Sequence, residues 1–222
     1  MKYILFDLDG TLLDFNSGEK NAFTSTIKEF AGYTPKDSEC KLFSDINEYL
    51  FNEYSSGKLK RIEFQEKRFQ EIMEKLNLKF DYSLANKFYI DNLKYQAILF
   101  PDVIDTLDYL SKKYELYIAS NGMKIVQTER IKKIAHYFKK SYISEEVGFN
   151  KPDKGFFDYI LKDINDPNPD EYIIIGDRLD TDILGGKTVN IKTMYLNRNN
   201  SKITDIKPDY EIKSLYEIKD IL

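Results

Sequence analysis

The chain has 222 residues, which is enough to bury a hydrophobic core as one large domain or as two modest ones. Its net charge of −4, with lysines interleaved among glutamates, excludes a nucleic-acid polymer as the expected partner and favours a small molecule. No apolar stretch approaches the roughly 20 residues that span a bilayer, so we expect no membrane insertion.

The first ten residues, MKYILFDLDG, lack the apolar region and the cleavage site of a signal peptide, which predicts a cytoplasmic protein. We expect this protein to be a monomer or a small homo-oligomer. Cys40 is the single cysteine, which excludes an intramolecular disulfide and a multi-cysteine zinc site, and we expect it to be inert and reduced.

Residues 2–6 form a short apolar run of β-prone residues, which predicts a buried strand that ends at Asp7. From residue 18 to about residue 96, apolar side chains recur at helical spacing. Breakers near residues 32–35, 57 and 77–81 divide this stretch into about four helices. The pattern predicts a helical bundle inserted after the first strand, with the phenylalanines and tyrosines of the insert in its core. The alternative for one or two of these rings, at the open end of the cap, is to stack on a substrate ring.

Beyond Pro101, segments of helical length alternate with short apolar runs at residues 116–119, 142–143, 172–175 and 192–196. This alternation predicts an α/β fold, a doubly wound (Rossmann-like) parallel sheet with helices on both faces. The predicted core domain comprises residues 1–16 and 97–222, and the inserted four-helix-bundle cap domain comprises residues 17–96.

Polar residues follow three of the predicted strands. Asp7 and Asp9 follow the first strand, Ser120 follows the second, and Asp177 follows a later one. Lys151 lies in the segment between Ser120 and Asp177. Ligands of open α/β sheets bind beyond the carboxyl ends of the strands, so we expect these side chains at one edge. Two carboxylates about 4 Å apart repel by about 4 kcal/mol at an effective dielectric constant of about 20, so such a cluster requires a cation. An acidic, all-oxygen site suits Mg²⁺.

Four ordered motifs, DLDGT at residues 7–11, SNG at 120–122, KP at 151–152 and GDRLDTD at 176–182, resemble those of the haloacid dehalogenase (HAD) superfamily. The resemblance spans residues 1 to about 196. It implies that Asp7 is the nucleophile that forms an aspartyl-phosphate, and that Asp9 protonates the leaving group and then activates water. It further implies that Mg²⁺ binds the Asp7 side chain, the Asp9 carbonyl oxygen and Asp177. Asp182 would act through water or orient its neighbours.

The same resemblance assigns the groups that hold the phosphate. Ser120 would donate to a phosphoryl oxygen with help from the backbone N–H groups of Asn121 and Gly122, and Lys151 would supply positive charge to the developing anion. Gly10 would permit the tight turn that brings the backbone close to the ligand. The helical insert resembles the four-helix cap of the superfamily's C1 group, which closes over the substrate and excludes water.

Residues 144–161 and 176–198 resemble, more narrowly, the branch that contains pyrimidine 5′-nucleotidases of the house-cleaning type. We therefore expect a Mg²⁺-dependent hydrolase of small-molecule phosphomonoesters, acting on nucleoside 5′-monophosphates. The alternative is another small phosphorylated metabolite, either a sugar phosphate or a phosphorylated acid.

Three other activities are less favoured. A phosphomutase stays open, because the motifs do not separate water from a sugar hydroxyl as the phosphoryl acceptor. Asp9 argues against a dehalogenase, which has no alcohol leaving group to protonate. The long helical insert argues against a non-enzymatic phospho-switch, since receiver domains lack such an insert.

Other charged or motif-like residues carry weaker signals. Lys124 and Arg178 are equally compatible with a place in the site and with surface salt bridges. His136, the only histidine, is expected to lie at the surface or to pack against neighbours. The sequence Gly186-Lys187-Thr188 has Thr181 where a P-loop requires glycine, so we expect no P-loop.

Overall fold

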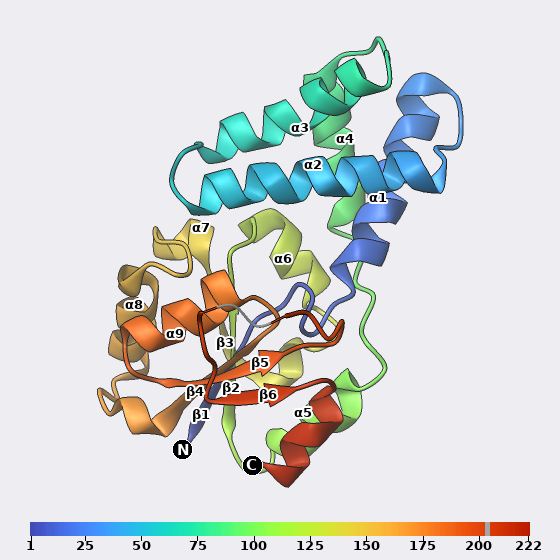
Figure 1. The fold of residues 1–222 in the computed structure, drawn as a ribbon. Coiled ribbons are helices and arrows are strands. Elements are labelled where there is room, and N and C mark those ends of the chain that lie inside the picture. Colours follow the sequence, from blue (N-terminus) through green and yellow to red (C-terminus); the bar gives the residue numbers. More distant parts are fainter. Residues whose placement is uncertain (203–204) are drawn as a thin grey trace. The chain divides into compact units, whose positions relative to one another are not determined.

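The chain folds into two compact units. The computed structural model describes residues 1–202 and 205–222 (Figure 1). One unit comprises residues 1–14 and 99–222, and the other comprises residues 15–98. Within the first unit, Leu13 forms an antiparallel bridge with Leu99, so the chain leaves and re-enters this unit at adjacent points. The first unit is thus built from both ends of the chain.

A six-stranded parallel sheet forms the centre of the first unit, with the strand order β3-β2-β1-β4-β5-β6. The strands are β1 (Tyr3–Phe6), β2 (Glu115–Ser120), β3 (Phe138–Ile143), β4 (Tyr172–Gly176), β5 (Lys192–Leu196) and β6 (Tyr210–Ile212). Ile4 and Phe6 of β1 face one hydrophobic cluster, and Tyr3 and Leu5 face another. Both faces of the sheet are therefore buried, and the predicted α/β fold is confirmed.

Helices flank this sheet. They are α5 (Val103–Leu110), α6 (Lys124–Arg130), α7 (Ser144–Val147), α8 (Lys154–Ile164) and α9 (Leu184–Thr188), with short helical turns η1 (Ala135–Tyr137), η2 (Pro169–Glu171), η3 (Leu179–Ile183) and η4 (Leu215–Asp220). Val103 and Leu107 of α5 pack into the cluster on one face, and Phe156 and Ile160 of α8 pack into the cluster on the other. This two-sided packing explains why the inner strands read as continuous apolar runs.

The edge strand β6 is not predicted from the sequence pattern. It has three residues, of which Ile212 is buried and the other two are exposed. A single buried side chain produces neither the apolar run nor the alternation that marks a strand. Only the pairing of β6 with β5 in the folded protein reveals it.

The second unit contains four helices, α1 (Phe15–Ala31), α2 (Asp37–Ser55), α3 (Arg61–Lys75) and α4 (Tyr82–Leu93). Gly32, Gly57 and Asn77 follow the first three helices with positive φ angles, at the predicted breakers. Aromatic rings pack inside the unit, where Phe23 stacks on Phe43 with ring centroids 4.2 Å apart. Both rings are buried in the bundle core, as predicted, but Tyr49 and Tyr95 are exposed, so the prediction is wrong for these two tyrosines of the insert.

A buried polar network also lies inside the helical unit. Asn47 donates a hydrogen bond to Glu19 at 2.7 Å, and Arg68 donates two to Asn86. Burial raises the pKa of Glu19 and lowers the pKa of Arg68, because each charge is removed from water. The network favours one packing of the four helices, since another packing would leave buried polar groups unsatisfied.

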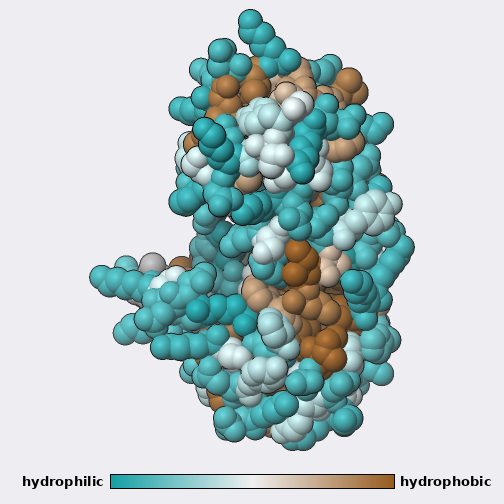
Figure 2. Space-filling model, turned by 90° about the vertical axis from the view of Figure 1, so that its right-hand side faces the viewer, coloured by the Kyte–Doolittle hydropathy of each residue, from teal (hydrophilic) through white to brown (hydrophobic). Residues whose placement is uncertain are grey.

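Hydrophilic side chains cover most of the face drawn in Figure 2, and hydrophobic areas interrupt them. Within residues 1–202 and 205–222, no helix combines the length and the apolar composition that crossing a bilayer requires. Cys40 is buried in α2.

Candidate active site

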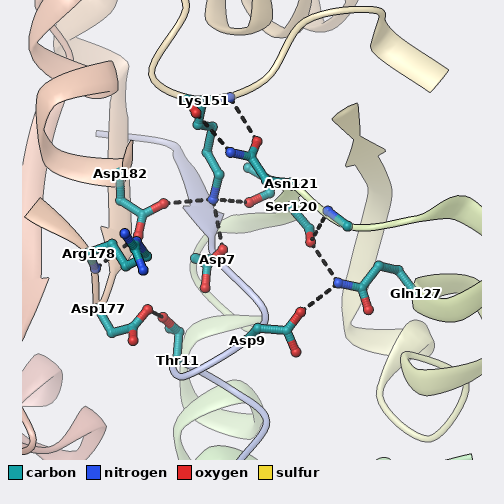
Figure 3. A network of polar contacts seen from close by, with 12 residues as sticks. Asp7, Asp9, Thr11, Ser120, Asn121, Gln127, Lys151, Asp177, Arg178 and Asp182 are labelled. Carbon is teal, nitrogen blue, oxygen red and sulfur yellow. Dashed lines mark hydrogen bonds and ion pairs between the residues drawn. The ribbon is translucent and has the colours of Figure 1, made fainter. Parts of the chain in front are cut away.

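The carboxyl ends of β1, β2 and β4 bring the predicted site residues together. β1 lies between the other two strands, and Phe6 is in register with Ile118 on one side and with Ile175 on the other. The residues that follow these positions therefore meet at one edge of the sheet, as Figure 3 shows for Asp7, Ser120 and Asp177. The Asp7 N–H donates to the Ile175 carbonyl at 2.9 Å, which extends the β-ladder as far as Asp7.

Lys151 lies at the centre of the polar network in Figure 3. Its Nζ donates to Asp7 Oδ1 at 2.7 Å, to Asp182 Oδ1 at 2.6 Å and to the Ala119 carbonyl at 2.6 Å. The side chain is 1% exposed, so protein oxygens stabilise its charge in place of water. Burial opposes that charge, but the carboxylates of Asp182 and Asp7 outweigh it and raise the pKa of Lys151. Lys151 is therefore a fixed cation beside Asp7.

Asn121 holds the main chain at Lys151. Its Nδ2 donates to the Lys151 carbonyl at 2.8 Å, and the Lys151 N–H donates to Asn121 Oδ1 at 2.7 Å. This two-way contact ties the end of β2 to the segment that carries Lys151. The sequence predicts a role for the backbone N–H of Asn121, and the structure adds a positioning contact from its side chain.

Three carboxylates gather beside Lys151. Asp7, Asp177 and Asp182 each offer one oxygen, and these oxygens lie within 4.8 Å of one another. Burial raises the pKa of Asp7 to about 7, although the positive charge of Lys151 lowers it. Burial also raises the pKa of Asp177, and the negative charges of Asp7 and Asp182 raise it further. Three carboxylates beside one lysine leave excess negative charge, and clustered hard oxygen donors fit a divalent cation such as Mg²⁺. Asp182 therefore lies in the same carboxylate cluster as Asp7 and Asp177, whereas the sequence alone predicts only an indirect role for it.

Two glycines leave room for the carboxylates. Gly10 has a φ angle of 83°, and a Cβ atom at this position would overlap the Asp177 carboxylate. A Cβ atom at Gly176 would overlap Asp182 in the same way. Thr11 donates to Asp177 Oδ1 at 3.4 Å and so helps to orient it. The close approach of these side chains to the strand ends therefore depends on glycine at both positions.

The Asp9 carboxylate is held by two residues of α6. Its Oδ2 accepts a hydrogen bond from Gln127 Nε2 at 2.7 Å, and its Oδ1 accepts from Arg130 Nη1 at 2.5 Å. The Asp9 side chain is 28% exposed, whereas that of Arg130 is 1% exposed. Sequence reasoning missed both Gln127 and Arg130. The available signal was two long polar side chains three residues apart, on one face of the helix that follows the SNG motif.

Ser120 also contacts Gln127. Its Oγ accepts from Gln127 Nε2 at 2.9 Å and from the Gly122 N–H at 3.2 Å. The Gly122 N–H, which the sequence predicts to assist a phosphoryl oxygen, is therefore directed at Ser120 in this structure. Gly122 has a second effect, because a Cβ atom there would overlap the Gln127 side chain.

Three residues with weaker sequence signals are Lys124, Arg178 and His136. Lys124 forms a salt bridge with Glu146 in which both side chains are exposed, which supports a surface role. The guanidinium of Arg178 pairs with Asp180, and its backbone N–H donates to Asp182 at 3.2 Å. The ring of His136 packs against the neighbouring tyrosine, with centroids 4.1 Å apart.

Known proteins resemble this chain in sequence and in fold. The family model of the haloacid dehalogenase-like hydrolases matches residues 1–190. One similar structure is that of the HAD-hydrolase YfnB from Bacillus subtilis, which is described as bound to magnesium and as revealing interdomain movement. It superposes on this chain with a TM-score of 0.94 at 29% sequence identity, and the match covers 100% of this chain and 98% of that chain. The pyrimidine 5′-nucleotidases PynA of Streptococcus pneumoniae and YjjG of Escherichia coli are 31% and 28% identical, over 100% and 99% of this chain and 94% and 97% of theirs. The chain therefore belongs to the haloacid dehalogenase-like hydrolases, as its four motifs predict.

Proposed function

We propose that this HAD-family phosphatase is a Mg²⁺-dependent phosphomonoester hydrolase that works through an aspartyl-phosphate on Asp7. The observation that carries the proposal is the contact of Lys151 with both Asp7 and Asp182, beside Asp177. It combines a carboxylate nucleophile, a fixed cation and oxygen ligands for a metal at one strand end. This combination suits phosphoryl transfer, in which charge stabilisation is the main requirement.

The proposed reaction has two steps. In the first, a carboxylate oxygen of Asp7 attacks phosphorus, the bond from phosphorus to the ester oxygen breaks, and that oxygen takes a proton from the Asp9 carboxyl group. The alcohol leaves and Asp7 carries the phosphoryl group. In the second, water attacks phosphorus, the Asp9 carboxylate takes a proton from that water, and the bond to Asp7 breaks. Inorganic phosphate leaves and the Asp7 carboxylate is restored.

Lys151 and Ser120 would stabilise the phosphoryl group from the protein side, one as a cation and the other as a hydrogen-bond donor. The side chains of Asp7 and Asp177 and the Asp9 carbonyl oxygen would hold Mg²⁺, with Asp182 beside them. When bound, the cation supplies neutralisation of the charge on the transferring phosphoryl group.

We propose nucleoside 5′-monophosphates, and pyrimidine nucleotides in particular, as the substrates, because PynA and YjjG are named pyrimidine 5′-nucleotidases. We propose that the predicted cap, residues 17–96, takes the role that the C1 resemblance implies and selects the alcohol part of the ester. The position of Asp9 disfavours carbon–halogen hydrolysis, since a halide leaves without a proton.

A panel of phosphomonoesters assayed with Mg²⁺ tests the substrate. We expect kcat/KM for dTMP and UMP to exceed that for purine nucleotides, sugar phosphates and phosphorylated acids by about tenfold or more, within the range that binding contacts provide. Equal values across the panel would remove the nucleotidase preference and leave the phosphatase. Transfer of the phosphoryl group to an added sugar instead of water would indicate a mutase, and inactivity on every ester would overturn the proposal.

Thermal unfolding tests the metal site without relying on activity. Burial raises the pKa of Asp7 to about 7, so Asp7 contributes stability to the metal-free protein at low pH that is lost as the pH rises through about 7. Mg²⁺ binds the ionised carboxylates, so it should stabilise the protein more at pH 8 than at pH 5.5. At pH 8 and a concentration ten times its Kd, we expect a gain of about 1.4 kcal/mol, or a rise in Tm of about 4 °C.

The controls for this measurement are NaCl at matched ionic strength and the variant Asp177→Asn, which removes one proposed ligand. We expect neither NaCl with the wild-type protein nor Mg²⁺ with Asp177→Asn to reproduce the rise in Tm. An equal rise at both pH values, or a full rise in the variant, would contradict a carboxylate metal site at this position.

A further inference from the structure

The side chain of Gln127 links Asp9 to Ser120. It donates from the same Nε2 to Asp9 Oδ2 at 2.7 Å and to Ser120 Oγ at 2.9 Å (Figure 3). An amide nitrogen has two N–H groups, so these two contacts use both of them. Gln127 is 2% exposed, and the absence of a side chain at Gly122 provides the space that it fills.

Arg130 determines which way the Gln127 amide points. Its Nη1 donates to Gln127 Oε1 at 3.1 Å as well as to Asp9 Oδ1. A guanidinium only donates hydrogen bonds, so the amide oxygen faces Arg130 and the amide nitrogen must face Asp9 and Ser120. The hydrogen-bond network therefore fixes the orientation of the Gln127 amide, because the orientation with its oxygen and nitrogen exchanged would place N–H donors against Arg130.

The direction of these bonds fixes the Ser120 hydroxyl. A serine hydroxyl has two acceptor lone pairs and one donor hydrogen. The Gly122 N–H and Gln127 Nε2 fill both lone pairs, so the remaining interaction of this hydroxyl is donation. Donation is the interaction that a phosphoryl oxygen requires.

We propose that Arg130 and Gln127 are positioning residues of the phosphatase reaction, with different tasks. Arg130 holds the Asp9 carboxyl where it meets the ester oxygen, and both oxygens of Asp9 are engaged by the pair. Gln127 also directs the Ser120 hydroxyl toward the phosphoryl group. This inference rests on the proposed function, because it assigns tasks within the two steps of the proposed reaction.

The two tasks separate by leaving group. A nucleoside 5′-monophosphate releases an alkoxide that needs the proton of Asp9, whereas 4-nitrophenyl phosphate releases a delocalised phenolate that leaves without one. We expect Arg130→Met to lower kcat/KM about 100-fold on the nucleotide, mainly through kcat, and less than about threefold on the aryl ester. Gln127→Glu should lower kcat/KM about 100-fold on the aryl ester, because the carboxylate that replaces the amide has no N–H to donate to Ser120. The loss on the nucleotide should be at least as large, because the hydrogen bond to Asp9 is removed as well.

The ratio of the two kcat/KM values does not depend on how much of a variant is folded, so it remains informative for destabilised protein. Arg130→Lys retains a buried cation and provides a second variant, whose ratio should lie between those of wild type and Arg130→Met. Lys132→Met changes a side chain that is 63% exposed, two residues further along the chain, and should match wild type on both esters.

Equal losses on the two esters in both Arg130 variants would overturn the positioning task of Arg130 and leave a structural one. An unchanged rate on the aryl ester in Gln127→Glu would overturn the task of Gln127. Either result with an active wild type would leave the proposed function intact, whereas a wild type inactive on both esters would remove the proposed function and this inference together.

Discussion

Replacing Asp7 with asparagine is expected to lower kcat for phosphomonoester hydrolysis by at least about 10⁴-fold. The carboxamide is a poor nucleophile and cannot form the acyl phosphate, so the first step of the reaction is lost. The fold should persist, because the asparagine oxygen can still accept the hydrogen bond that Lys151 gives to Asp7 at 2.7 Å. The measurement is steady-state hydrolysis of the fastest ester in the panel, together with urea unfolding.

Stability separates this result from simple unfolding. Burial raises the pKa of Asp7, so its ionised form is unfavourable in the metal-free protein at pH 8. Asp7→Asn removes that charge, and the free energy of unfolding should not fall. The matched control is Asp180→Asn, in the GDRLDTD motif, because its side chain is 55% exposed and pairs with Arg178. Activity in Asp7→Asn close to that of Asp180→Asn would rule out Asp7 as the nucleophile.

The fold and much of the candidate site follow from local sequence signals. Asp7 ends a run of four buried residues, and a buried strand that stops at a carboxylate is visible in one short stretch of sequence. The order of the motifs then places Ser120 and Asp177 at neighbouring strand ends, because parallel strands all present their carboxyl ends at one edge. Periodicity locates these residues without any knowledge of contacts.

The contacts of Asp9 do not follow from such signals. Gln127 lies 118 residues from Asp9 and Arg130 lies 121 residues away, and they meet only because β1 pairs with β2 and α6 follows β2 directly. Their spacing on α6 marks a shared face but does not show which residue that face meets. The strand β6 is not predicted either, because it has little local sequence pattern and is defined by its pairing with β5.

The burial of Lys151 likewise becomes visible only in three dimensions. In the sequence it stands beside Pro152 among polar residues and resembles a surface lysine, yet its side chain is 1% exposed and contacts three oxygens. Two of those oxygens belong to Asp7 and Asp182, so Lys151 neutralises carboxylates that would otherwise repel each other. It should therefore contribute to stability as well as to the reaction.

Lys151→Met tests both contributions. Removing one partner of a buried ion pair typically costs about 3 to 5 kcal/mol, because the charge that remains has lost its partner. We expect a loss of that size in the free energy of unfolding at pH 8, and a fall in kcat of about 10²- to 10³-fold on the folded fraction, since the phosphoryl group loses a fixed cation. The checks are urea unfolding and single-substrate kinetics.

The pH dependence of this loss identifies its cause. Asp7, with its pKa raised to about 7, becomes protonated at pH 5.5, which removes much of the repulsion that Lys151 offsets. The destabilisation by Lys151→Met should therefore be smaller at pH 5.5 than at pH 8. Lys154→Met, which removes an exposed lysine paired with Asp158 on α8, should show neither effect. A destabilisation that is equal at both pH values would mean that Lys151 stabilises the fold through packing and not through the charges of Asp7 and Asp182.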